Sequence, residues 1–179
     1  MADTSTWVFG YGSLIYKVDF PFIEREPASI TGWARRFWQG SHDHRGTPEA
    51  PGRVVTLIPS PGNVCQGVAY RITHDVFDHL DHREKNGYQR MQTSIALRDS
   101  QREVCGVTYY ADADNVAFLG PQAHEPLAQH IARATGPSGR NIDYALQLAT
   151  ALRELDEEDA HVFAIEALLL EQQRRADSG

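Results

Sequence analysis

The order of apolar runs along the chain is the feature that most restricts its fold. Runs of β-forming residues come first, joined by short segments rich in Gly, Pro, Asn and Asp, with one helical stretch over residues 74–84. Helical patterns follow from about residue 126 onward. Because turns rather than repeated helical crossovers join the strands, this order favours an antiparallel or mixed α+β domain over a doubly wound parallel sheet.

The apolar and turn-forming residues also predict where the elements lie. Strands are expected at residues 6–9, 30–38, 53–58, 64–72, 88–98 and 103–111. The segment Pro59-Ser60-Pro61-Gly62-Asn63 is typical of a turn, so 53–58 and 64–72 are expected to form a hairpin. Thr73 is expected to cap the helix over 74–84, and Gly87 to end it.

Three helices are expected in the C-terminal part. They are predicted at residues 126–135, at 140–155, and from an acidic group at 156–159 to about Arg175. The acidic residues at the start of the last helix and the arginines near its end suit the helix dipole.

Composition limits the classes of function. The chain has 179 residues, a formal net charge of −7 and a pI of about 5.6. This length suits a single domain over residues 1–179, and this charge argues against a general binder of nucleic acids or anionic membranes. We find neither a secretory signal nor a long apolar span, so a cytoplasmic protein is expected. Cys65 and Cys105 lie in β-like runs and are both expected to be reduced core residues.

The segment Phe9-Gly10-Tyr11-Gly12-Ser13-Leu14 is a candidate anion site. A strand that ends in two glycines and a serine can present consecutive backbone N–H groups to a carboxylate or a phosphate. The segment matches neither a P-loop nor a dinucleotide-binding fingerprint. An ordinary strand-to-turn transition explains the same residues equally well.

Two other segments offer groups for proton transfer or hydrogen bonding. Glu84 stands in the charged run 81–88, where a helix gives way to a strand. The run is either a solvated face or the site of a general base. Tyr109 and Tyr110 are neighbours on a strand, so one of them faces the interior, where a buried phenol needs a hydrogen-bond partner.

The loop at residues 40–52 contains further polar candidates. His42 and His44 are candidate ligands of a metal ion, with Asp43, His79 and His82 as further ligands. Their spacing matches no known helical or hairpin zinc pattern, so we expect no metal. Arg45 in the same loop is either a receptor for an anion or a solvated arginine.

These segments are most informative when they are taken together. The informative segments are residues 8–15, 36–41, 44–46, 51–57, 67–70, 83–85, 87–88, 119–121 and 136–141. In this order and spacing they resemble the ChaC-type, glutathione-specific γ-glutamylcyclotransferases, over about residues 7–169.

The resemblance implies a fold, a reaction and a set of residues. The fold is a small mixed β-barrel of the γ-glutamylcyclotransferase type, flanked by helices and followed by a C-terminal helical segment. The reaction is cleavage of reduced glutathione to 5-oxoproline and Cys-Gly, in the cytoplasm and without a cofactor. Glu84 matches the family's catalytic glutamate. The pocket for the γ-glutamyl group matches Tyr11, Gly12, Ser13 and Leu14, and the family's loop arginine and strand tyrosine match Arg45 and Tyr109.

The resemblance leaves alternatives open. The chain has His74 and Asp75 where relatives often carry glutamates, so Asp75 is the near candidate for a second acid. A cyclotransferase acting on γ-glutamyl amino acids or γ-glutamylamines would share Glu84 and the anion loop. The segments 37–40 and 136–141 favour the glutathione branch. A non-catalytic regulatory or binding protein is the other alternative, and the oligomeric state is not predicted.

Overall fold

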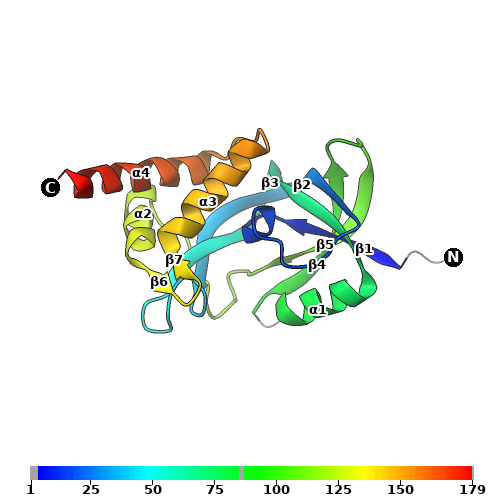
Figure 1. The fold of residues 1–179 in the computed structure, drawn as a ribbon, viewed down its shortest axis with the longest axis horizontal. Coiled ribbons are helices and arrows are strands. Elements are labelled where there is room, and N and C mark those ends of the chain that lie inside the picture. The colour runs from blue at the N-terminus through cyan, green and yellow to red at the C-terminus, as the bar shows by residue number, and fades with distance from the viewer. Residues whose placement is uncertain (1–3, 85–86, 179) are drawn as a thin grey trace. The chain divides into compact units, whose positions relative to one another are not determined.

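The computed structural model of the chain describes residues 4–84 and 87–178. Residues 1–3, where a secretory signal would begin, lie outside the described part. The chain divides into two compact units (Figure 1). The barrel unit comprises Met1–Arg35 and Leu57–Asn115, and the helical unit comprises Arg36–Thr56 and Val116–Gly179. Two long strands, β2 (Glu24–Ser41) and β3 (Gly52–Thr73), contribute residues to both units.

The strands form a closed barrel in the order β1-β3-β2-β4-β5. The remaining strands are β1 (Ser5–Gly10), β4 (Gln89–Leu97) and β5 (Glu103–Tyr110). The β1–β3, β2–β4 and β4–β5 pairs are antiparallel, whereas β1 and β5 pair in parallel. The mixed α+β class and the small mixed barrel predicted from the sequence are therefore confirmed.

The interior of the barrel unit is filled by large apolar side chains. Val8 and Phe9 of β1 are almost completely buried, as are Tyr70 and Ile72 of β3. Gly67 lets these strands approach closely, because a Cβ atom there would lie 2.3 Å from the carbonyl oxygen of Gly10. A glycine at this position is thus required by the packing of β1 against β3.

The predicted hairpin over residues 53–72 is wrong. Residues 59–63 belong to one strand, β3, which extends over 22 residues. Proline fixes φ at a value that an extended strand tolerates, and Pro59 and Pro61 are both exposed. Gly62 has a φ of +85°, which accommodates a local distortion that an L side chain would resist.

The helix expected over 74–84 is confirmed as α1 (His74–Glu84). The Oγ1 atom of Thr73 accepts a hydrogen bond of 3.5 Å from the N–H of Val76, as expected for a capping residue. The N–H of Tyr88 donates to the carbonyl of Glu84 at 3.0 Å, just beyond the helix. A short 3-10 helix, η1 (Ser13–Ile15), follows β1.

The strands β4 and β5 also form as predicted, but one of the cysteine predictions is wrong. Cys65 is buried, whereas Cys105 is exposed. Alternation along β5 places Cys105 on the same outward face as Glu103, and this explains its exposure.

The helical unit contains the three helices expected in the C-terminal part. They are α2 (His124–Arg133), α3 (Asn141–Glu154) and α4 (Ala160–Asp177), and two short strands, β6 (Thr135–Gly136) and β7 (Gly139–Arg140), connect α2 to α3. The Oδ1 atom of Asp159 accepts a hydrogen bond from the N–H of Val162 at 3.0 Å, so an acid caps α4 as predicted. Across residues 4–84 and 87–178, no helix has the length and apolar character needed to cross a membrane.

Buried polar contacts join α3 to the part of β3 that belongs to the helical unit. Asn141, which is fully buried, accepts a hydrogen bond from the N–H of Arg53 at 2.7 Å and donates one to the carbonyl of Arg53 at 2.8 Å. The N–H of Val55 donates to the hydroxyl of Tyr144 at 3.2 Å. These contacts satisfy backbone groups that burial would otherwise leave unpaired.

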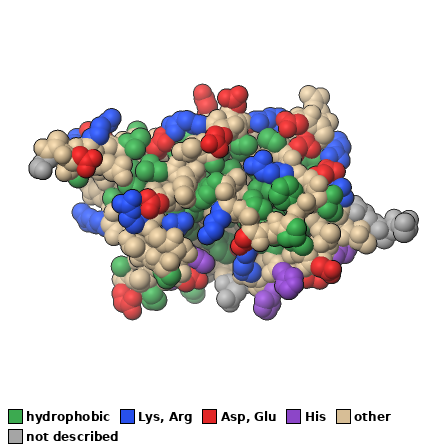
Figure 2. Space-filling view, viewed as in Figure 1, with side chains coloured by type: hydrophobic (Ala, Val, Ile, Leu, Met, Phe, Trp, Pro, Cys, Tyr) green, Lys and Arg blue, Asp and Glu red, His purple; other side chains and the backbone are tan. Residues whose placement is uncertain are grey.

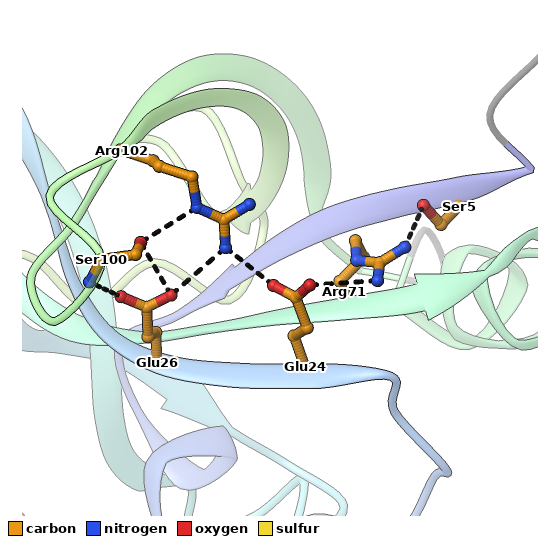
Figure 3. Close-up of polar contacts among 6 residues, drawn as sticks. All are labelled: Ser5, Glu24, Glu26, Arg71, Ser100 and Arg102. Carbon is orange, nitrogen blue, oxygen red and sulfur yellow. Dashed lines mark hydrogen bonds and ion pairs between the residues drawn. The ribbon is translucent and has the colours of Figure 1, made fainter.

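A polar network connects β2, β3 and the turn between β4 and β5 in the barrel unit (Figure 3). Arg102 contacts Glu24 at 2.8 Å and Glu26 at 3.5 Å, and Arg71 contacts Glu24 at 3.1 Å. Ser100 donates to Glu26 through both its N–H, at 2.5 Å, and its hydroxyl, at 3.0 Å. Burial opposes ionisation of Glu26, but these donors outweigh it and lower the pKa of its carboxyl group.

This network generates a prediction about pH and stability. A carboxyl group whose pKa is lowered by folding stabilises the protein fully above about pH 5, and that stabilisation is lost as the pH falls through the lowered pKa. We expect Glu26→Gln to reduce the free energy of unfolding at pH 7 by about 1–3 kcal/mol. The loss should shrink toward pH 3, as measured by urea unfolding at pH 7, 5, 4 and 3.

The control for this prediction is Asp99→Asn, which changes an exposed acid of the same turn. The control should reproduce the stability of the wild type at each pH. Curves for Glu26→Gln and the wild type that stay parallel from pH 7 to pH 3 would contradict the prediction.

Candidate functional site

The candidate anion loop begins where β1 ends. Gly10 permits the tight turn, because a Cβ atom there would lie 2.6 Å from the Cβ atom of Leu14. The carbonyl of Gly12 accepts a hydrogen bond from Ile15 at 3.0 Å, and that of Ser13 accepts one from Lys17 at 2.7 Å. The N–H groups of Gly12, Ser13 and Leu14 donate to no group within residues 4–84 and 87–178. These three donors remain available to a ligand.

Tyrosine hydroxyls hold both ends of this loop. The hydroxyl of Tyr11 donates to the backbone carbonyl of Tyr109 at 2.6 Å, and this bond is buried. The hydroxyl of Tyr70 donates to the carbonyl of Leu14 at 2.5 Å. The loop is therefore attached to β5 at its start and to β3 at its end.

The Tyr109 side chain is buried and has the partner that a buried phenol requires. Its hydroxyl lies 2.7 Å from Oδ1 of Asp81, a residue of α1. The other oxygen of Asp81 accepts from Nη1 of Arg90 on β4, at 3.0 Å. Burial raises the pKa of Tyr109 well above its usual range, and the hydrogen bond to Asp81 raises it further. Tyr110, the neighbour on the other face, is only half-buried and packs against Trp33.

Glu84 is the last residue of α1 and is not a freely solvated charge. Its side chain is 26% exposed, and one carboxylate oxygen lies 3.7 Å from Nε of Arg83. Arg83 also contacts Asp19, which follows the anion loop, at 2.9 Å. The Glu84 carboxylate is close enough to Tyr109 to contribute to the rise in the pKa of that phenol. Lys85 and Asn86, which continue the charged run, lie outside the described residues.

The barrel unit thus brings together several of the residues predicted from the sequence. Tyr11 contacts Tyr109 directly, Tyr109 contacts Asp81, and Glu84 lies one helical turn beyond Asp81. Asp81 was not predicted as a site residue, because in the sequence it is only one member of the charged run 81–88. Its spacing of three residues from Glu84, on the same side of a helix, was the available signal. Asp75 lies exposed in the first turn of α1.

Arg45 lies in the helical unit, apart in the chain from the residues just described. Its N–H donates to Oγ of Ser41 at 2.9 Å, and its Nη1 donates to the carbonyl of Arg140 at 3.2 Å. The guanidinium lies 5.8 Å from the ring centre of Tyr144, within the range of a cation–π contact. Arg45 is therefore held in place within its own unit and is not a loosely solvated arginine.

The histidine loop offers little to a metal ion. His44 interacts with Oγ of Ser138 at 3.0 Å through its Nδ1 atom. Within the described ranges, no three His, Cys, Asp or Glu side chains gather in a way that could hold a metal ion. On the face seen in Figure 2, acidic and basic side chains are interspersed.

Comparisons with known proteins agree with this arrangement. The family of ChaC-like proteins matches residues 6–172. A γ-glutamylcyclotransferase 2-3 of Arabidopsis thaliana is 47% identical over 167 residues, which cover 87% of this chain and 84% of that protein. A glutathione-specific γ-glutamylcyclotransferase 1 of Danio rerio is 41% identical over 176 residues, which cover 93% of this chain and 90% of that protein.

A solved structure supports the same assignment. The crystal structure of a γ-glutamylcyclotransferase specific to glutathione from yeast superposes with a TM-score of 0.85 and 33% sequence identity. The match covers 94% of this chain and 97% of the yeast chain. From its sequence, its barrel and these relatives, the chain belongs to the ChaC-like protein family.

Proposed function

We propose that this protein cleaves the γ-glutamyl bond of reduced glutathione by intramolecular aminolysis, in the cytoplasm and without a cofactor. The products are 5-oxoproline and Cys-Gly. The observation that carries the proposal is the 41% identity, over nearly the whole chain, to a relative that is named as glutathione-specific. The superposition on the yeast enzyme, whose name also specifies glutathione, supports it independently.

The chemistry needs little beyond positioning and proton transfer. The α-amino nitrogen of the γ-glutamyl group attacks its own γ-carbonyl carbon, a five-membered ring closes, and the bond to the cysteine nitrogen breaks. Nucleophile and electrophile belong to one molecule, so holding the folded conformer is worth ~7–11 kcal/mol of the barrier. The amine binds as an ammonium, which has no lone pair until a base removes a proton. An acid must then protonate the departing nitrogen.

We assign both proton transfers to Glu84. A carboxylate at the end of α1 can take the proton from the ammonium and return it to the leaving nitrogen. Its partial burial beside Arg83 supports this role, because a positioned carboxylate transfers protons more effectively than a mobile one.

The remaining site residues are assigned to substrate binding. The N–H groups of Gly12, Ser13 and Leu14 are assigned to the α-carboxylate of the γ-glutamyl group, because they are donors without protein partners within residues 4–84 and 87–178. Arg45 is assigned to a substrate carboxylate, since its guanidinium is held by the carbonyl of Arg140 and the ring of Tyr144 and is suited to bind one. Tyr11 and Tyr109 complete the binding site of the γ-glutamyl group.

The substrate class is tested by incubating the purified protein, without added metal, with reduced glutathione, oxidised glutathione or γ-Glu-Ala. We expect 5-oxoproline and Cys-Gly from reduced glutathione only. Faster turnover of γ-Glu-Ala would instead indicate a cyclotransferase for γ-glutamyl amino acids, an alternative left open by the Arabidopsis relative, whose name specifies no peptide. No product from any substrate, with a folded sample, would indicate a regulatory or binding protein.

The role of Glu84 is tested by Glu84→Gln, which keeps the shape of the side chain and removes its capacity for proton transfer. We expect turnover of glutathione to fall ~10²–10⁴-fold. The matched control is Asp78→Asn, which neutralises an exposed acid on the same helix and should leave turnover within twofold of the wild type. Activity of Glu84→Gln within tenfold of the wild type would remove Glu84 from this role.

A further inference from the structure

The hydroxyl proton of Tyr109 is already committed to a protein acceptor. A phenol has one proton to donate, and the oxygen of Tyr109 lies 2.7 Å from Oδ1 of Asp81. The second oxygen of Asp81, Oδ2, accepts a hydrogen bond from Nη1 of Arg90 at 3.0 Å. An arginine stays protonated in proteins, so its partner here is a carboxylate, which only accepts hydrogen bonds. The phenol is therefore the donor in its bond with Asp81.

Because the phenol of Tyr109 donates its only proton to Asp81, its oxygen can take part in further hydrogen bonds only as an acceptor. Its lone pairs can receive a hydrogen bond from a ligand, but the oxygen cannot donate to a ligand unless the bond to Asp81 breaks. The proton of Tyr11 is committed in the same way, because it is donated at 2.6 Å to the carbonyl of Tyr109. Donation from either phenol to the γ-carbonyl oxygen of a substrate would thus break an existing hydrogen bond, which is buried for Tyr11 and partly buried for Tyr109.

Of the groups on a γ-glutamyl substrate, the α-ammonium best suits such an acceptor. It offers three donors and a positive charge. The carboxylate of Asp81 bonds to the phenol oxygen, and that of Glu84 is near enough to act on it electrostatically. Negative charge around an acceptor favours a cation over a carbonyl oxygen or a second carboxylate.

We propose that Asp81 is a positioning residue that fixes Tyr109 as a hydrogen-bond acceptor, and that the Tyr109 oxygen receives the α-ammonium of the substrate. The inference rests on the proposed function and adds a residue and a direction of hydrogen bonding to it. When Glu84 removes one proton from the ammonium, one of the two remaining N–H bonds stays on the Tyr109 oxygen. That contact restricts rotation of the amine and directs its new lone pair toward the γ-carbon.

The test compares two ligands that differ only at the α-amine. One is glutathione, and the other is glutaryl-Cys-Gly, in which hydrogen replaces the amino group. Calorimetry measures the Kd of both in a Glu84→Gln background, where turnover does not interfere. Tyr109→Phe is expected to weaken binding of glutathione about tenfold to a hundredfold, and binding of glutaryl-Cys-Gly less than twofold. Equal weakening of both ligands would overturn the inference, because Tyr109 would then bind a group that both contain.

A second variant tests the positioning role of Asp81. The side-chain amide of Asp81→Asn can donate to the phenol oxygen and so occupy its lone pairs. We expect the same selective loss of glutathione binding, while Arg90→Lys, which retains a cation beside Asp81, keeps the selectivity for the amine. If Asp81→Asn weakens binding of glutathione and of glutaryl-Cys-Gly equally, with an unchanged melting temperature, the positioning role is contradicted.

A structure decides the question if Tyr109→Phe fails to fold. In crystals of Glu84→Gln with glutathione, the α-nitrogen should lie within about 3.2 Å of the Tyr109 oxygen. A γ-carbonyl oxygen in that position would overturn the inference. Failure of the proposed function is distinguishable, because it would appear as absence of 5-oxoproline with the wild type, whereas the inference depends on binding alone.

Discussion

The hydrogen bond between Tyr109 and Asp81 is the contact on which the organisation of the candidate site depends. It attaches the last turn of α1 to β5, and Arg90 extends the attachment to β4. Glu84 follows Asp81 by three residues, so whatever holds Asp81 also restricts the position of the proposed base. The backbone of Tyr109 in turn holds Tyr11 and the start of the anion loop. One tyrosine thus connects the candidate anion loop with the helix that carries Glu84.

The barrel supplies the rigid frame for these contacts. Its strands β1 and β5 pair in parallel, so the anion loop after β1 and the Tyr109 end of β5 lie at the same end of adjacent strands. Close packing of β1 on β3 depends on Gly67, and the ion pairs around Glu24 and Glu26 connect β2, β3 and the β4–β5 turn. A site on such a frame suits a reaction in which holding one conformer of the substrate is the main requirement.

Much of the fold could be predicted because local signals and the final structure agree. The helix α1 has an apolar stripe and a capping threonine, and it forms within the predicted bounds. The hairpin prediction failed because Pro and Gly at residues 59–62 favour turns locally, whereas these residues belong to the single strand β3. The spacing of Asp81 from Glu84 was a weak signal, but its contact with Tyr109, 28 residues further along the chain, could not be predicted from the sequence. The exposure of Cys105 depends on which face of β5 turns outward, and composition alone does not determine that.

In the proposed reaction the substrate's own amine, and not water, breaks the γ-glutamyl bond. The most direct measurement is turnover of glutathione in water enriched in ¹⁸O, with mass spectrometry of the released γ-glutamyl product. Intramolecular attack predicts 5-oxoproline that carries no oxygen from the solvent, because nitrogen closes the ring. Glutamate carrying one ¹⁸O atom would show that water is the nucleophile and would contradict the account.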